Sequence, residues 1–461
     1  MNTSQHGALA LAEELLGFGP KMLAQADHAQ LERLLLDWCA VVIRGTQTPW
    51  GEKLHSWARD NAGAGGAWLA GSGTRRAAAA AALVNGTCAH GYELDDTHDD
   101  SMSHPGAVVI SAAMAVAGQI DAEGGRVLPA IVAGYEAMAR IGMAANALES
   151  IQFGFHPTSV FGGFGAAAAA AHLKGLSPEQ LAMAWGHCLS MCAGSLQFSE
   201  EPKGTMVKRL HAGFPAHNGV LAAELAELGV TAPVQALEGR YGLFTLYGRE
   251  PRPELLRRSP EAPLQIHRVS IKPYSCCRKF HSLIDALHEA TGGGTLEPDA
   301  IESITVFSPA AAIDQHQQRR PDSVMAAQYS MPYIVGATLG YGATRYDAYE
   351  VDHHRDARIL SIIDKVQAER DPSFESDFPA HMGNAVSIRL KDGTLKSARV
   401  QDSRGTPFRP LAMDEVRSKA AGLLAESRGS RDLDRIEAAI QALARSPGVD
   451  ELMQALQGDC V

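Results

Sequence analysis

Runs of alanine and other small apolar residues recur through the first half of this chain. Residues 77–82 and 166–171 are uninterrupted alanine, and residues 107–118 are apolar apart from one serine. Alanine is the strongest helix former, and its small side chain lets neighbouring helices approach closely. Residues 31–43 repeat their apolar side chains at a helical period. We therefore predict closely packed core helices up to about residue 260.

The pattern changes near Pro260. Residues 264–271 and 301–307 are rich in β-branched side chains and predict two strands, with a helix between them from about 277 to 290. Asp392-Gly393 lies between two alternating runs, which is the strongest short signal for a β-hairpin. Helical patterns return after Pro410. Because 461 residues are many for one core, we predict a mainly α protein with a large all-helical domain and a smaller α+β domain.

Charge and cysteine content exclude several classes of protein. A formal net charge of −11 argues against nucleic acid and anionic membranes as partners. No apolar run reaches the length of a membrane span, and no basic, apolar secretory signal is evident at the N-terminus. The seven cysteines lack zinc or disulfide spacing, which indicates reduced thiols. We expect a cytoplasmic protein.

Basic residues nevertheless form a local group that suits a small polyanionic ligand better than a polymer. Its members are Lys203, Lys208, Arg209, Lys272, Arg278 and Lys279.

Residues 90–105 are unusually rich in ionisable side chains. The segment reads H-G-Y-E-L-D-D-T-H-D-D-S-M-S-H-P and holds five carboxylates and three histidines between apolar runs. Ionisable groups beside core-forming sequence are where pKa values shift and acid–base chemistry occurs. Asp99 and Asp100 fit a solvated acidic loop better than a catalytic role.

Two histidines precede prolines that open apolar runs, His104-Pro105 and His156-Pro157. Proline is favoured at the first helical position, so each histidine is expected at or just before a helix N-terminus. The positive end of a helix binds carboxylates and favours a neutral imidazole, which can act as a base. An equally simple interpretation is that both histidines only cap their helices.

The ordered motifs of this chain resemble the MmgE/PrpD family, which includes 2-methylcitrate dehydratases, cis-aconitate decarboxylases and iminodisuccinate epimerases. After the first segment come G-F-H-P at 154–157, K-R-L-H-A-G at 208–213, L-E-G-R-Y-G at 237–242, I-K-P-Y-S-C-C-R at 271–278 and Q-Y-S-M-P-Y at 328–333. The resemblance implies that residues 405–461 complete a helical domain of residues 1–262, while residues 263–404 form the α+β domain.

The resemblance also assigns roles to individual residues. His104 and His156 match active-site histidines, Lys208 and Lys272 match cationic positions, and Asp96 is expected to orient a neighbouring imidazole. The predicted substrate-binding residues are Glu93, Thr97, Cys277, Arg278, His281 and Tyr333.

Other polar residues receive lesser roles. Asp95 is expected to cap a helix, Lys203 and Arg209 to be peripheral, and His211 and His217 to be structural.

The chain departs from the family pattern at two site positions. Many members have Asp where this chain has Glu93, which moves the carboxylate by about one methylene. The cis-aconitate decarboxylases have histidine where this chain has Cys277, and a neutral thiol is a poor substitute for a proton-donating imidazole. This makes decarboxylation of cis-aconitate less expected, and His281 is the alternative source of an imidazole.

We therefore predict a cofactor-independent lyase of the hydro-lyase type that acts on a small di- or tricarboxylate, as 2-methylcitrate dehydratase does. An epimerase or racemase of a dicarboxylate and a non-catalytic carboxylate-binding protein are the alternatives. Asp and His ligands also suit a metal ion. No H-E-x-x-H or paired cysteine motif supports one, and the resemblance implies metal-independent chemistry and a homodimer.

Overall fold

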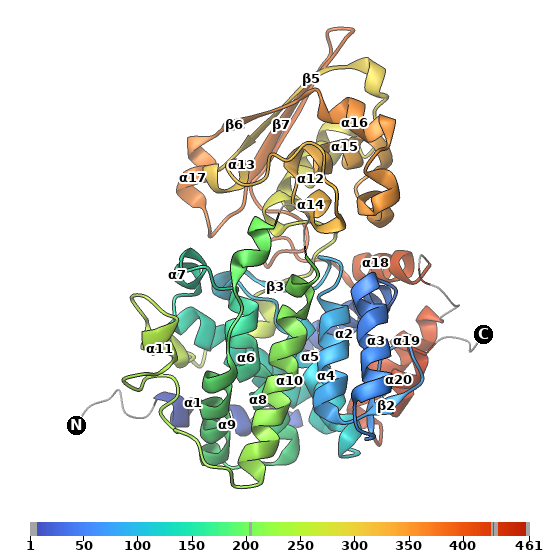
Figure 1. Ribbon diagram of the computed structural model, residues 1–461. Helices are drawn as coiled ribbons and strands as arrows, with labels where there is room; N and C mark the ends of the chain where they lie inside the picture. The colour runs from blue at the N-terminus through green and yellow to red at the C-terminus, as the bar shows by residue number, and fades with distance from the viewer. Residues whose placement is uncertain (1–6, 202–204, 426, 428–431, 458–461) are drawn as a thin grey trace. The chain divides into compact units, whose positions relative to one another are not determined.

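The computed structural model describes residues 7–201, 205–425, 427 and 432–457 (Figure 1). The chain divides into two compact units. Unit 1 comprises Met1–Phe198, Met206–Ser270 and Ala412–Val461, and unit 2 comprises Ser199–Thr205 and Ile271–Leu411. The sequence predicts that the smaller domain begins after residue 262 and ends at residue 404.

Unit 1 is almost entirely helical, which confirms the predicted fold class. Its α-helices are α1 (Gly7–Leu16), α2 (Gln25–Thr46), α3 (Pro49–Asn61), α4 (Ala78–Ala89), α5 (Pro105–Gln119), α6 (Gly124–Ala144), α7 (Ala147–Gln152), α8 (Pro157–Lys174), α9 (Pro178–Met191), α10 (Val207–Glu227), α11 (Leu243–Leu246), α18 (Met413–Ala425), α19 (Leu433–Ala442) and α20 (Asp450–Ala455).

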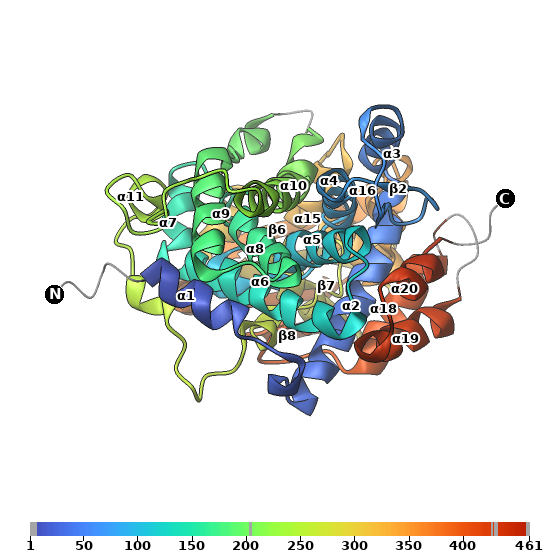
Figure 2. The same ribbon diagram turned by 90° about the horizontal axis from the view of Figure 1, so that it is seen from below.

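The centre of unit 1 is built from α4, α5, α6, α8 and α10, which pack against one another (Figure 2). The three alanine-rich runs lie in α4, α5 and α8, as predicted. Helices α6 and α8 approach so closely that a Cβ atom added to Gly165 would lie 2.8 Å from the carbonyl oxygen of Gly134. Small residues are therefore a requirement of this core.

Helix α6 is long and apolar enough to cross a membrane by length and composition. However, 94% of its apolar window is buried inside the protein. We therefore interpret it as a core helix.

Unit 2 contains a four-stranded sheet in the order β6-β5-β7-β8. Its strands are β5 (Ile301–Ser308), β6 (Val366–Arg370), β7 (Asn384–Leu390) and β8 (Leu395–Val400). Strands β5 and β6 are parallel, and the other pairs are antiparallel. The hairpin predicted at Asp392-Gly393 joins β7 to β8, and Gly393 supplies the positive φ of 88° that its turn needs.

Helix α12 (His281–Thr291) packs on β7 and β8. The remaining α-helices of unit 2 are α13 (Ala310–Ile313), α14 (Val324–Gln328), α15 (Met331–Tyr341), α16 (Ala357–Ile363) and α17 (Pro372–Asp377).

The strand predicted over residues 264–271 is largely wrong. The chain forms a 3-10 turn at Gln265–His267 and only a two-residue strand, β4 (Val269–Ser270), which pairs with β3 (Thr97–His98). Side-chain hydrogen bonds to this backbone take the place of the hydrogen bonds between paired strands that the sequence predicts. The Gln265 N–H donates to the Glu136 carboxylate at 2.5 Å, and the Ile266 carbonyl accepts from the Gln30 amide at 2.9 Å.

Candidate active site

Residues 90–104 connect α4 to α5 and begin and end on a histidine. His90 is the C-cap of α4, and His104 is the N-cap of α5. Glu93 adopts a left-handed backbone conformation with φ of 57°. Such strain in a non-glycine residue clusters at functional sites. Most of the segment is buried, whereas Asp100 is exposed and Asp99 half-buried.

Asp95 holds the two histidines at the ends of this segment. Its Oδ2 atom lies 2.6 Å from His90 Nδ1 and 3.2 Å from His104 Nδ1. A carboxylate accepts hydrogen bonds, so His90 donates to it through Nδ1, and the same carboxylate oxygen lies beside the Nδ1 atom of His104. Burial lowers the pKa of His90 to about 3, which keeps this ring neutral near pH 7. The expected role of Asp95 as a helix cap is wrong, because its carboxylate orients imidazoles instead.

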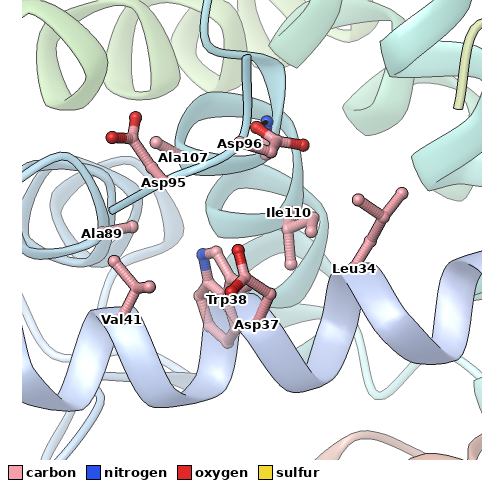
Figure 3. Close-up of a pocket in the computed structure, with 10 residues that line it drawn as sticks. Leu34, Asp37, Trp38, Val41, Ala89, Asp95, Asp96, Ala107 and Ile110 are labelled. Atoms are coloured by element: carbon pink, nitrogen blue, oxygen red, sulfur yellow. Dashed lines mark hydrogen bonds between the residues drawn. The ribbon is translucent and has the colours of Figure 1, made fainter. Parts of the chain in front are cut away.

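The side chain of Asp96, rather than that of Asp95, hydrogen-bonds to the first turn of a helix. Its Oδ1 atom accepts from the Gly106 N–H in the first turn of α5 at 2.8 Å, and its Oδ2 atom accepts from the Tyr135 hydroxyl at 2.6 Å. Burial raises the pKa of Asp96 to about 7. The carboxylates of Asp95 and Asp96 point apart (Figure 3). The predicted role of the Asp96 carboxylate in orienting an imidazole is therefore wrong.

The backbone of Asp96 fixes the tautomer of His104. His104 Nδ1 donates to the Asp96 carbonyl oxygen at 3.0 Å, and Thr97 Oγ1 lies 3.4 Å from the same nitrogen. A carbonyl oxygen only accepts, so the hydrogen is on Nδ1 and the lone pair of the neutral ring is on Nε2. The His104 side chain is 13% exposed, which leaves it within reach of a ligand. Its position at the N-terminus of α5 confirms that prediction.

Glu93 forms ion pairs with Lys208 and Arg209 of α10. All three side chains are at most 2% exposed. The expected peripheral place of Arg209 is therefore wrong, and its guanidinium also lies 5.3 Å from the centroid of the Trp50 ring. Two cations and one carboxylate give this group a formal charge of +1. Lys203, the other residue expected to be peripheral, lies outside the described residues.

His156 is the N-cap of α8, as predicted, and has an imidazole partner on α10. Its Nδ1 atom lies 3.2 Å from His211 Nδ1, so one ring donates and the other accepts. Burial, and then the charge of Lys208, lowers the pKa of both rings, to about 4 for His211. His211 was expected to be only structural, whereas it completes a histidine pair. His217 instead contacts Asn218 at 3.1 Å.

The imidazoles form one continuous group, with ring centroids 4.8 Å apart for His90 and His104, 6.2 Å for His104 and His156, and 5.2 Å for His156 and His211. His104 and His156 stand at the N-termini of two long helices, and Lys208 and Arg209 supply buried positive charge in the same unit. Such an arrangement can bind carboxylates and accept or donate protons.

Comparison with known proteins agrees with the order of these elements. The MmgE/PrpD N-terminal domain model matches residues 10–256, and the MmgE/PrpD C-terminal domain model matches residues 274–445. The chain belongs to the MmgE/PrpD family.

Several relatives of this MmgE/PrpD protein are named for one reaction. A cis-aconitate decarboxylase-like protein of Aspergillus oryzae is 30% identical over 95% of this chain and 93% of its own. The cis-aconitate decarboxylase of Aspergillus terreus is 26% identical over 92% and 90%, and that of Mus musculus is 30% identical over 74% and 70%.

The other predicted site residues of this MmgE/PrpD protein belong to unit 2. Lys272 is 1% exposed and lies just after β4. Cys277 precedes α12, and its N–H donates to the Gln328 carbonyl oxygen at 3.0 Å, so the two family motifs of this unit contact each other. Arg278 is half-buried beside it. The roles of these residues toward a substrate stay predictions.

Two more residues of unit 2 make local hydrogen bonds. His281 Nε2 lies 3.2 Å from the Cys276 carbonyl oxygen, and the Tyr333 hydroxyl donates to the Ala348 carbonyl oxygen at 2.8 Å. Burial raises the pKa of Tyr333, so its phenol stays protonated.

His90, Asp95 and His104 are also the one group of three described residues whose ligand atoms lie close enough together to hold a metal ion. The hydrogen bonds above explain this proximity in another way. His104 Nδ1 carries a hydrogen toward a carbonyl oxygen, whereas a metal-binding nitrogen must offer its lone pair. The Nδ1 atoms of His90 and His104 are therefore engaged in hydrogen bonds in the form that the structure shows.

The sequence does not indicate the site contacts of His90, Asp95, Tyr135, Arg209 and His211. His211 follows Lys208 by three residues, a helical spacing that places both on one face and could have indicated it. Tyr135 lies in an apolar helix with no local signal.

Proposed function

We propose that this protein is a cofactor-independent lyase that acts on a small di- or tricarboxylate by removing a proton α to a carboxylate. His104 is the base. The observation that carries the proposal is its tautomer, since the hydrogen bond from Nδ1 to the Asp96 carbonyl leaves the lone pair on Nε2. Asp95 stabilises the imidazolium that forms when Nε2 takes the proton.

The charges around His104 support a polyanionic substrate. Lys208, Arg209 and Glu93 carry a formal charge of +1 in a buried setting. The N-termini of α5 and α8 add partial positive charge beside His104 and His156. These groups favour the enolate-like charge that develops when the α-proton leaves.

Dehydration fits this arrangement best. His104 Nε2 takes the α-proton, the C–H electrons form the double bond, and the C–O bond to the hydroxyl breaks. The proton on His104 then leaves with the hydroxyl as water, so the enzyme returns to its starting state. A 2-hydroxy tricarboxylate such as 2-methylcitrate is the substrate class that we propose.

Decarboxylation of an unsaturated tricarboxylate is the second candidate, because relatives of this chain are named cis-aconitate decarboxylases. That reaction needs an acid to protonate the carbon that loses CO₂. Burial lowers the pKa of His90, His156 and His211, which keeps these rings neutral and favours a reaction begun by a base. Epimerisation, the other alternative, would need a second group to return the proton to the opposite face.

Proton NMR of the purified protein in D₂O tests these candidates together, with citrate, 2-methylcitrate, cis-aconitate, malate, tartrate and iminodisuccinate as substrates. New vinyl signals from a hydroxy acid support the dehydratase, as does a new allylic methyl signal from 2-methylcitrate, because the alkene formed at its methyl-bearing carbon has no vinyl hydrogen. Loss of cis-aconitate with release of CO₂ supports the decarboxylase. Deuterium in otherwise unchanged substrate indicates the epimerase. Binding of these acids without exchange or turnover would contradict an enzyme. We also propose a cytoplasmic homodimer, which sedimentation of the purified protein tests for its oligomeric state.

A further inference from the structure

A buried lysine of the C-terminal segment contacts the loop that carries the candidate acid–base residues. Lys419 of α18 is 5% exposed. Its Nζ atom donates to the Leu94 carbonyl oxygen at 2.7 Å and lies 2.5 Å from Asp37 Oδ1 of α2. Both partners belong to unit 1, to which the chain returns after it has completed unit 2.

The carbonyl group that Lys419 contacts lies between two residues of the site. Leu94 is preceded by Glu93, which pairs with Lys208, and followed by Asp95, which orients His90 and His104. A shift of the Leu94 peptide therefore moves both carboxylates. Because hydrogen-bond strength falls steeply with distance and angle, even a small shift weakens the contacts of Asp95 with the imidazoles.

A small cavity separates this loop from α2. It has a volume of about 10 Å³, which is room for about one water molecule. Asp37, Asp95 and Asp96 line it together with apolar residues, and Figure 3 shows Asp37 and Trp38 on the side of α2 that faces the loop. Asp95 thus borders a small void on the side of α2, and the hydrogen bond from Lys419 to the Leu94 carbonyl oxygen fixes the backbone next to it.

We propose that Lys419 is a positioning residue for the reaction proposed above. Its ammonium group holds the Leu94 carbonyl against α2, and so places the Asp95 carboxylate at hydrogen-bonding distance from His104 Nδ1. Asp37 provides the counter-charge that allows an ammonium group to be buried here. A buried ion pair contributes little net stability compared with apolar side chains of the same size, so positioning is the better account of why this one is present.

The test compares wild type with Lys419→Met and with the double variant Asp37→Leu/Lys419→Met. Methionine keeps the apolar stem of lysine without the ammonium. The single variant leaves Asp37 buried with its charge, which destabilises the protein whatever the role of Lys419. The double variant removes both charges, recovers stability, and still lacks the donor to Leu94. Lys365→Met is the matched control, because Lys365 also donates to a backbone carbonyl, that of Ile301 in unit 2, at 2.7 Å.

Two measurements separate positioning from stability. NMR of protein labelled with ¹⁵N-histidine reports the hydrogen-bonded Nδ1–H resonances of His90 and His104 and needs no turnover, so it remains informative if the proposed reaction is wrong. The second measurement is kcat and KM on the substrate found above. We expect both Lys419 variants to shift the His104 resonance and to lower kcat about 10- to 100-fold with little change in KM. Lys365→Met should change neither.

Wild-type resonances and kcat in the double variant would overturn the proposal and reduce Lys419 to a structural role. A shifted His104 resonance in a protein that turns over none of the acids would support the positioning role while rejecting the proposed function.

Discussion

His156 Nδ1 and His211 Nδ1 lie 3.2 Å apart in the interior of unit 1. Two neutral imidazoles at this distance share one hydrogen, so the tautomer of one ring determines that of the other. With His211 as the donor, His156 carries its own hydrogen on Nε2 and can donate it to a carboxylate or hydroxyl of a substrate. His211, which lies on α10, therefore controls which hydrogen bond His156 at the start of α8 can make.

His211→Phe removes this partner and keeps a ring of similar size. Loss of one hydrogen bond of about 1 kcal/mol should lower kcat about fivefold, because His156 would no longer be held in one tautomer. The pH profile of kcat should change with it, since His211 no longer opposes protonation of His156. His217→Phe on the same helix is the control, and steady-state kinetics across pH 5 to 9 is the measurement. Equal effects of the two substitutions would contradict a specific role for His211.

Asp95→Asn should lower kcat by about 10²- to 10⁴-fold. A carboxamide keeps the shape of the side chain, but it cannot stabilise the imidazolium form of His104 or require a hydrogen on the Nδ1 atom of His90. Asp100→Asn in the same segment is the matched control, because Asp100 is exposed and pairs with Arg268 at the surface. Rates within a factor of two of wild type for Asp95→Asn would contradict the orienting role.

Asp96→Asn should change how stability depends on pH. The pKa of Asp96 is raised from its ordinary value of 3.8 to about 7 in the folded protein. The folded state thus holds a proton that the unfolded state has lost, and wild type loses stability as pH rises from about 4 to about 7, by on the order of a few kcal/mol. Asparagine has no such titration. Urea unfolding at pH 4.5, 6 and 7.5 should show the variant gaining stability relative to wild type with rising pH.

His90→Asn should give the opposite trend. The pKa of His90 is lowered from 6.5 to about 3 in the folded protein. Between these pH values the unfolded state binds a proton that the folded state does not bind. Wild type therefore loses stability as pH falls below about 6.5, by about 1.4 kcal/mol per pH unit for one proton. Asparagine can still donate to Asp95 but does not titrate. Relative to wild type, this variant should become more stable as pH falls from 6.5 to 4.5 in the same urea experiment, and parallel curves would contradict the assignment.

The helical fold was predictable because its signals are local. Alanine runs and the prolines after His104 and His156 specify helices and their N-termini without reference to distant residues, and the Asp392-Gly393 turn specifies its hairpin in the same way. The pattern of residues 264–271 is typical of a strand, so the sequence predicts one there. In the fold, the side chains of Glu136 and Gln30, which are far away in the sequence, form hydrogen bonds with this backbone instead.

The segment that holds the candidate site was predictable from the sequence, but the contacts of its individual side chains were not. Asp95 and Asp96 are neighbours with the same side chain, and only the fold decides that one faces two imidazoles and the other faces Tyr135 and α5. Lys419 and His211 reach the site from α18 and α10, and no pattern in the segment 90–105 points to them.

The central claim is that His104 Nε2 removes the α-proton of a small polycarboxylate. Its most direct test is the rate of α-proton loss to D₂O, followed by NMR for wild type and His104→Gln with the substrate that wild type turns over. We predict that the variant loses at least about 10²-fold in this rate, while calorimetry still detects binding of the same acid. Proton loss at the wild-type rate in His104→Gln would contradict the account and assign the base to another residue.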